Sequence, residues 1–375
     1  MHPSDIHLVL FLSRATPLQR WDKMGILERE IAIYKELSQR LGKISIVSSG
    51  DSRELAYQEM LGNIQVLYNR WRLSPNAYSI FAPLLHWSSL HNATIYKTNQ
   101  PDGAWTAVIA GIIYNKPVIA RAGYLWADLY KQERGRNLRS ILIDLLQSFS
   151  FTRARAIVLT TEVMKQHFIH AYHISPERIT VIPNNVNTDI FIPMPDVVRI
   201  RHRICFIGRL HPIKNLHLVI KAISGIPDVS LVIIGQGEQH DQLGALSRAI
   251  MVNVNFLGTI PNDQIPLELN RSELFILPST VEGHPKALIE AMACGIAVIG
   301  ADSPGIREII QHGKTGWLCK TDVESLQQGI RFLLDHPDLR IDLGMNARRY
   351  VLEHFSLDRI VDMEYSFITG IVNSR

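Results

Sequence analysis

The chain has 375 residues, of which 46% are hydrophobic and 20% are charged, and its formal net charge is +4. This length exceeds that of an ordinary single domain, so two domains, each with its own core, are expected. No apolar run reaches the roughly 18 residues that span a bilayer, and the first residues lack the lysines of a signal peptide. These features exclude an integral membrane protein and predict a cytoplasmic one.

Cysteine and histidine usage argues against a metal centre. Cys205, Cys294 and Cys319 are far apart in the sequence, which fits neither a disulfide framework nor a paired-cysteine zinc site. The histidines show no ligand-like spacing. We therefore expect reduced core thiols, no metal and no cofactor.

The first half of the chain alternates short β-branched runs with helical segments. Strands are predicted at residues 6–12, 43–49, 93–98, 116–122, 156–160 and 178–185, and helices at 26–42, 104–115 and 162–171. Such alternation predicts a parallel sheet wrapped by helices.

A second alternation follows a proline-containing segment near residues 191–201, which we interpret as a linker. It has predicted strands at 203–209, 230–237, 254–258, 273–279, 296–301 and 316–320, and a predicted helix at 285–295. The fold class is therefore α/β, with two facing Rossmann-like, doubly wound domains and a central cleft. We place the domains at residues 1–195 and 196–355, and expect a helix at about 356–375 to pack back on the first.

Positive charge is concentrated in the first half, where residues 1–200 hold 22 Lys and Arg against 16 Asp and Glu. Its densest part is residues 131–155, in which basic residues flank an aliphatic stripe that includes Ile141, Leu142 and Leu145. One interpretation is a helix that rests on an anionic membrane, as a peripheral protein at its inner face would. The other, which we favour, is a core-facing amphipathic helix with a solvated basic rim.

Two glutamates mark a candidate site in the second half. Glu282 falls in the loop after the strand predicted at 273–279, and ligands bind at the carboxyl ends of such strands. Pro285 suits the first turn of the following helix and Gly295 its end. Glu290 lies within this helix among apolar residues, so its carboxylate needs hydrogen-bond donors. A pair with Lys286 would supply one, and the hydroxyls of a bound sugar or ribose would be another.

Cations are predicted to reach the same place. Arg209 and Lys214 follow Gly208 at the end of the strand predicted at 203–209, where their side chains can bind a diphosphate. Two cations for a diphosphate and two carboxylates for sugar hydroxyls predict a nucleotide-sugar site.

A resemblance supports this prediction. FIGRLHPIKNLHLVIKA, VNFLGTIPND and the long segment from LFILPSTVEGHPKALIEAMACG to GWLC resemble the carboxyl-terminal half of glycosyltransferase family 4. These are retaining, metal-independent enzymes of the GT-B fold. The match spans most of residues 203–355, whereas VIPNNVNTDIF resembles the inter-domain segment of the family more loosely.

The resemblance implies roles for individual residues. Arg209 and Lys214 would neutralise the donor diphosphate, while Glu282 would contact the donor sugar and Glu290 the ribose. The catalytic candidates are thus Glu282, Arg209 and Lys214. The donor-binding candidates are Gly208, Leu257, Gly258, Gly283, His284, Pro285, Lys286, Ala287, Leu288 and Glu290.

The chain also departs from the family pattern. Many members have Glu-Gly-Phe-Gly where this chain has Glu282-Gly283-His284-Pro285, so His284 either contacts the donor, which we favour, or shapes the start of the helix. The first half follows the family poorly, because Gly123 and Tyr124 stand where relatives place a histidine. Our acceptor-side candidates are Gly25, Asn99, Gln100, Arg121 and Tyr124, together with Asp102 and Trp126.

The sequence thus predicts a retaining hexosyltransferase that moves a sugar from a UDP- or GDP-linked donor to a glycan or glycolipid, in cell-surface polysaccharide biosynthesis. The alternative is a nucleotide-sugar epimerase on the same scaffold. VIIGQG lacks the third glycine of a dinucleotide fingerprint, which disfavours a dehydrogenase. Retention of all four charged residues disfavours a silent binding module. Nucleic acid is not an expected partner.

Overall fold

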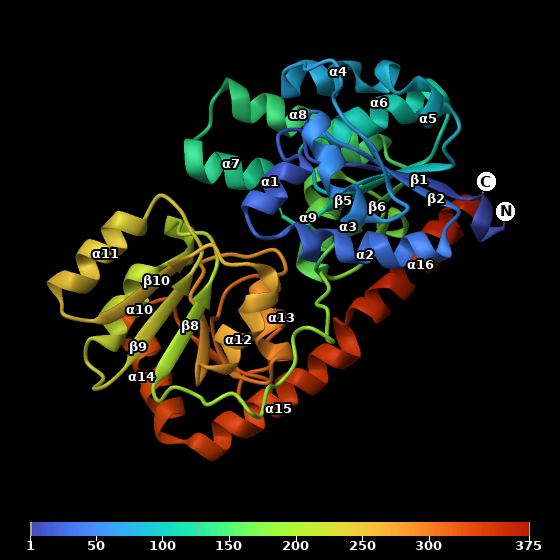
Figure 1. Cartoon of the computed structure of the whole chain (residues 1–375). Coiled ribbons are helices and arrows are strands. Elements are labelled where there is room, and N and C mark those ends of the chain that lie inside the picture. Colours follow the sequence, from blue (N-terminus) through green and yellow to red (C-terminus); the bar gives the residue numbers. More distant parts are fainter. Residues whose placement is uncertain (1, 125, 375) are drawn as a thin grey trace. The chain divides into compact units, whose positions relative to one another are not determined.

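The computed structural model describes residues 2–124 and 126–374, except the side chains of Leu129, Gln132, Glu133 and Arg134. It divides into two compact units, Met1–Pro183 with Ile360–Arg375, and Asn184–Arg359 (Figure 1). Each unit contains one parallel sheet covered by helices, which confirms the predicted α/β class.

The first unit is built on a seven-stranded sheet with the order β3-β2-β1-β4-β5-β6-β7, in which every pairing is parallel. The strands are β1 (His7–Phe11), β2 (Lys43–Val47), β3 (Gln65–Leu67), β4 (Ile95–Thr98), β5 (Val118–Ala122), β6 (Ala156–Leu159) and β7 (Ile179–Val181). The chain fills one side of β1 before it returns to fill the other, so the order reverses between β1 and β4. This is a topological switch point, where open sheets bind ligands.

Helices cover both faces of this sheet. They are α1 (Leu18–Lys23), α2 (Leu27–Arg40), α3 (Gln58–Leu61), α4 (Pro75–Leu85), α5 (Trp87–His91), α6 (Ala104–Tyr114), α7 (Trp126–Arg134), α8 (Leu138–Arg153), α9 (Glu162–Tyr172) and α16 (Leu357–Asn373). One core joins the sheet to α4, α5 and α6. On another side of the sheet, Lys97 of β4 forms a buried ion pair with Glu364 of α16, at 2.6 Å between Nζ and Oε1.

The second unit repeats this plan with a six-stranded parallel sheet of order β10-β9-β8-β11-β12-β13. The strands are β8 (Arg203–Ile207), β9 (Ser230–Ile234), β10 (Asn253–Gly258), β11 (Leu274–Leu277), β12 (Ala297–Ala301) and β13 (Trp317–Cys319). The helices are α10 (Leu216–Ile223), α11 (His240–Ala249), α12 (Ile265–Asn270), α13 (Lys286–Ala293), α14 (Val323–Asp335) and α15 (Pro337–His354). Here the switch point lies between β8 and β11.

The boundary between the units differs from the predicted one at 195/196. Residues from 184 onward join the second unit because their polar groups and side chains are held there. Phe191 is buried in its core, the Nδ2 of Asn184 donates to the carbonyl of His284, and the backbone N–H of Met194 donates to Asn270 at 2.8 Å. The predicted linker at 191–201 therefore packs against the second unit.

The helix around Glu290 forms one residue later than predicted. Pro285 is the residue before α13 and has an extended conformation (φ −71°, ψ 111°), so it precedes the first turn instead of lying in it. Gly295 follows the helix with φ +68°, which confirms its predicted place as a terminating glycine.

The basic segment forms two helices, α7 and α8, and the orientation of α8 contradicts the interpretation we favoured from the sequence. The buried residues of α8 are Ser140, Gln147, Ser150 and Phe151. The exposed ones include Leu138, Ile141, Leu142 and Leu145. These members of the aliphatic stripe thus face solvent, whereas Leu146 and Phe149 are half-buried. In the described parts of the chain, no helix is both long and apolar enough to cross a bilayer.

Candidate functional site

The switch point of the second unit brings Lys214 and Glu282 together. Lys214 ends a short 3-10 turn, Pro212–Lys214, in the loop after β8, and Glu282 lies in the loop after β11. These strands are neighbours in the sheet, so their carboxyl ends meet at the same edge. The Nζ of Lys214 donates to Oε1 of Glu282, and both side chains are largely buried.

Hydrogen bonds from Asn215 join the two loops and hold this pair. Its Nδ2 donates to the carbonyl of Pro278 at 3.1 Å and to the hydroxyl of Thr280 at 2.7 Å. The N–H of Thr280 donates to the carbonyl of Ile213 at 3.0 Å. The positions of Lys214 and Glu282 are therefore set by the backbone and do not depend on their own attraction alone.

The loop after β12 also holds Glu282 in place. The backbone N–H of Glu282 donates to the carbonyl of Pro304 in this loop at 3.0 Å. Gly305 has φ +82°, and a Cβ at this position would lie 2.2 Å from the carbonyl oxygen of Glu282. Only glycine allows this close approach, so the sequence at 305 directly affects the placement of the carboxylate.

Glycines also draw the ends of β8, β9 and β10 together. The N–H of Gly208 donates to the carbonyl of Ile234 at 2.9 Å, and that of Gly235 to the carbonyl of Gly258 at 2.7 Å. Leu257 and Gly258 end β10, where the register shifts. Arg209 follows Gly208 directly and is exposed. All the candidates that follow strands thus lie at the carboxyl edge of one sheet.

Helix α13 begins at this edge, immediately after Glu282 and Gly283. The amides of Lys286, Ala287 and Leu288 form its first turn, which gives the edge hydrogen-bond donors and a partial positive charge. Glu290 lies in the following turn and is 1% exposed. The positive end of α13 thus follows closely after Glu282, and a buried carboxylate lies one turn further along the helix.

His284 is buried, and its ring packs edge-on against Phe355 with 4.8 Å between ring centroids. This packing favours the alternative role weighed above, in which His284 shapes the start of α13. Contact with the donor stays a prediction.

In the first unit, a cation and a carboxylate also meet across the switch point. Arg14 follows β1 and Asp102 follows β4, with 3.5 Å between Nε and Oδ1. The N–H of Arg14 also donates to the carbonyl of Asp102 at 3.4 Å. Burial raises the pKa of Asp102, although the charge of Arg14 opposes this shift.

Four of the predicted acceptor-side residues lie on β5 or in the loops that follow β4 and β5. The Oε1 of Gln100 accepts from the N–H of Gly123 at 3.0 Å, and Nη1 of Arg121 donates to the carbonyl of Asn99 at 3.4 Å. Burial and the nearby charge of Asp102 raise the pKa of Tyr124. These residues follow or end β4 and β5, so they share one edge of the sheet.

Gly25 is placed differently. It follows α1 with φ +66°, and its N–H donates to the carbonyl of Asp22 at 2.8 Å. Its conformation is accounted for by the end of a helix, so its predicted place on the acceptor side stays a prediction.

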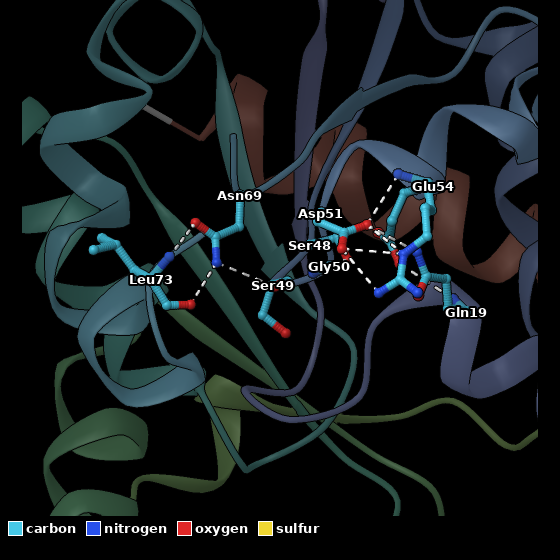
Figure 2. Close-up of polar contacts among 9 residues, drawn as sticks. Gln19, Ser48, Ser49, Gly50, Asp51, Glu54, Asn69 and Leu73 are labelled. Carbon is cyan, nitrogen blue, oxygen red and sulfur yellow. Dashed lines mark hydrogen bonds and ion pairs between the residues drawn. The ribbon is translucent and has the colours of Figure 1, made fainter. Parts of the chain in front are cut away.

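A separate polar cluster fixes the loops after β2 and β3 (Figure 2). Asn69 donates to the carbonyl of Leu73 at 2.7 Å and accepts from its N–H at 3.1 Å. Nearby, Glu54 accepts from the N–H of Gln19 at 3.2 Å, at the start of α1, and burial raises its pKa. Asp51 accepts from Nε2 of the same glutamine at 3.3 Å. The cluster thereby anchors the segment that follows β1 and carries Arg14.

Arg14 and Asn215 were not among the residues predicted from the sequence. The signal for Arg14 is its place two residues after the strand predicted at 6–12, since Arg209 was identified by its place at the end of a predicted strand. Asn215 has φ +51°, and an asparagine between a short turn and a helix is one of the few side chains that tolerate this conformation.

Two models of known protein families match the chain, one in each unit. The model described as "Glycosyl transferases group 1" matches residues 200–350, and that described as "Glycosyltransferase Family 4" matches residues 31–190. Together these matches cover most of the chain.

Curated relatives include two enzymes that are each 26% identical to this chain. One is the GDP-mannose-dependent alpha-(1-6)-phosphatidylinositol monomannoside mannosyltransferase of Mycolicibacterium smegmatis, with 68% of this chain and 72% of that protein aligned. The other is a subunit of the phosphatidylinositol N-acetylglucosaminyltransferase of Saccharomyces cerevisiae, with 68% and 58% aligned. A relative from Haemophilus influenzae, described as an uncharacterized glycosyltransferase, is aligned over 52% of its length. The chain therefore spans between about half and three quarters of these proteins.

Among solved structures, Anabaena HepE in complex with UDP and glucose superposes with a TM-score of 0.80 at 18% identity, over 97% of this chain and 99% of HepE. Sucrose-phosphate synthase from Thermosynechococcus elongatus superposes with a TM-score of 0.81 at 15% identity, over 98% and 100%. These likenesses confirm the predicted GT-B fold.

Proposed function

The chain belongs to glycosyltransferase family 4, and from this premise we propose that it transfers a sugar from a UDP- or GDP-linked donor to a hydroxyl of a glycan or glycolipid. The observation that carries the proposal is the meeting of Lys214 and Glu282 at the switch point of the second unit. A family likeness alone would not require a cation and a carboxylate at this edge.

We assign the donor to the second unit. Arg209 and Lys214 would neutralise the diphosphate, and the amides at the start of α13 would donate to its oxygens. Glu282 would accept hydrogen bonds from the sugar and Glu290 from the ribose. Two cations and a helix end can supply the charge that a metal ion provides elsewhere, so the proposed reaction needs no metal.

The proposed transfer retains the configuration of the sugar. The acceptor oxygen bonds to the anomeric carbon on the face from which the diphosphate leaves, while the bond between that carbon and the phosphate oxygen breaks. The departing phosphate oxygen takes the proton of the acceptor hydroxyl. The side chains orient both partners and stabilise the charge that develops on the diphosphate.

We assign the acceptor to the edge of the first unit where Arg14, Asp102, Gln100, Arg121 and Tyr124 gather. The carboxylate and amide oxygens there are suited to sugar hydroxyls. By name, two relatives act on phosphatidylinositol or its mannoside, which supports a lipid-linked acceptor and a role in building cell-surface polysaccharide.

Replacement of Lys214 or Glu282 by alanine tests the assignment. We expect turnover to fall by about 100-fold or more, because each change removes charge that acts on the transition state. Turnover is measured as release of nucleoside diphosphate with and without acceptor, after a thermal-shift panel of UDP- and GDP-sugars has identified the donor.

Lys221→Ala and Glu353→Ala serve as matched controls, because both side chains are exposed elsewhere in the same unit. Near-normal turnover in Lys214→Ala or Glu282→Ala would refute the assignment. Release of an altered nucleotide sugar without any acceptor would instead identify an epimerase.

A further inference from the structure

Three helices of the first unit expose several large apolar side chains, although most of the residues that they bury are small or polar. In α8 the exposed residues are Leu138, Ile141, Leu142 and Leu145, while Ser140, Gln147 and Ser150 are buried. In α4, Ile80, Phe81 and Leu84 are exposed, whereas Ser79, Ala82 and Pro83 are buried. In α6, Ile112 and Ile113 are exposed, and the buried residues include three alanines, at 104, 107 and 110, and the glycine at 111.

These helices form one continuous layer. Helix α6 packs against α4 on one side and α8 on the other, and α5, with exposed Trp87, contacts both α4 and α6. Figure 1 shows α4, α5, α6 and α8 grouped at the top of the first unit, on the outside of the sheet. We call the ten exposed residues of this layer the apolar face: Ile80, Phe81, Leu84, Trp87, Ile112, Ile113, Leu138, Ile141, Leu142 and Leu145. A group of exposed large apolar side chains that spans four packed helices indicates an interaction site.

The charges around the apolar face distinguish between occupants. Helices α4, α5 and α6 contain no acidic residue, and α8 contains only Asp144, which pairs with Lys131 at 2.6 Å. Arg136 and Arg139 are exposed at the start of α8. A face that lacks net negative charge and carries arginines at its rim is complementary to anionic lipid.

A hollow beside the face is also suited to a lipid headgroup. It has a volume of about 320 Å³ and is lined by residues that include Arg70, His86, Trp87 and Ser89. Trp87 belongs both to this hollow and to the apolar face. A guanidinium and hydroxyls next to an exposed indole provide donors for a phosphate at the depth where aromatic rings lie in a bilayer.

We propose that the apolar face docks this protein on the surface of an anionic membrane, with its aliphatic side chains inserted among the acyl chains. This role extends the membrane contact considered for the basic segment alone, since it places the anchor on four helices and in aliphatic residues as well as arginines. It does not depend on the proposed transfer reaction, because vesicle binding is measured without donor or acceptor.

The test is sedimentation of the full chain with vesicles of phosphatidylcholine containing about a third of phosphatidylglycerol. The double variant Leu142→Gln with Leu145→Gln should bind about tenfold or more weakly, because two inserted side chains become polar. Its matched control is Ile341→Gln with Met345→Gln on α15. The exposed fractions of the first pair, 56% and 62%, are close to the 50% and 56% of the second. The control variant should bind as the parent does.

A charge variant separates the two contributions. Arg136→Glu with Arg139→Glu should weaken binding to the anionic vesicles about tenfold or more, and should change the weaker binding to pure phosphatidylcholine much less.

Failure of the parent to sediment with anionic vesicles, or equal losses in the α8 and α15 variants, would overturn the proposal. A dimer in ultracentrifugation that Leu142→Gln with Leu145→Gln converts to monomer, without vesicle binding by the parent, would instead assign the face to a second copy of the chain. Loss of transfer with vesicle binding intact would concern the proposed function only.

Discussion

The two units share one architecture, but their candidate sites are not equally easy to identify from the sequence. Both are doubly wound parallel sheets, and in both a cation and a carboxylate meet across the switch point, Arg14 with Asp102 and Lys214 with Glu282. In the second unit, the pair belongs to contiguous segments that resemble the family. In the first, the same geometry comes from scattered residues. The switch point therefore brings a cation and a carboxylate together in both units, and the family motif only makes the pair in the second unit easier to find.

The largest expected difference between the two units is a loss of stability when the buried ion pair in the core of the first unit is broken. Lys97 and Glu364 are each 1% exposed, and the ammonium lies 5.5 Å from the centre of the Tyr34 ring. Lys97→Met leaves the carboxylate buried without its ion-pair partner, so the free energy of unfolding should fall by about 3 to 5 kcal/mol.

This loss is measured by urea unfolding followed by tryptophan fluorescence, since five of the six tryptophans lie in the first unit. The double variant Lys97→Met with Glu364→Leu should recover much of the stability, because it buries no charge. A single variant as stable as the parent would show that the pair contributes little.

Acid should weaken the first unit more than the second. Burial lowers the pKa of His7 and of His86 to about 4 each, and both residues lie in the first unit. A histidine with a lowered folded pKa contributes stability that is complete above about 6.5 and is lost as the pH falls toward 4. Across this pH window, we expect the free energy of unfolding of the first unit to fall by an amount on the order of 2 kcal/mol.

The measurement compares urea unfolding at pH 7.5 and pH 4.5 in the parent and in His86→Phe, which cannot gain a proton at this position. The variant should have a shallower pH dependence. Identical dependence in both proteins would mean that His86 protonates without cost in the folded state.

The smallest expected effect tests whether the acceptor and the nucleotide bind at different sites. Asp102→Asn removes the charge opposite Arg14 but keeps the shape, so we expect the KM for acceptor to rise about tenfold. Affinity for the nucleoside diphosphate, measured by calorimetry, should stay the same, whereas Arg209→Ala should weaken it. A change in nucleotide affinity in Asp102→Asn would place the donor differently from our proposal.

Hydrophobic periodicity was sufficient to predict the fold class. The short β-branched runs are the buried strands, and the parallel sheets follow from their alternation with helices. Positions after strands also predicted that Lys214 and Glu282 would meet, because the carboxyl ends of neighbouring parallel strands share an edge. Their assignment to phosphate and sugar stays a prediction.

Other features depend on contacts that periodicity does not encode. Helix α8 has an apolar stripe that the usual rule turns inward, yet the sheet side of the helix is filled by Ser140, Gln147 and Phe151. The ring of His284 packs against Phe355, which is far away in the sequence, and its predicted contact with the donor stays a prediction. Similarly, the unit boundary was placed too late because Asn184 and Phe191 make their contacts far along the chain.

The first unit is assembled from two separate stretches of chain, and this has a consequence for its synthesis. Its last helix leaves the ribosome only after the whole of residues 184–359, which are contiguous and contain a complete sheet. During translation, the second unit can therefore finish folding first. Until Glu364 emerges, the nascent amino-terminal sheet holds Lys97 without its carboxylate. In this protein, the half that is made first is the half that is completed last.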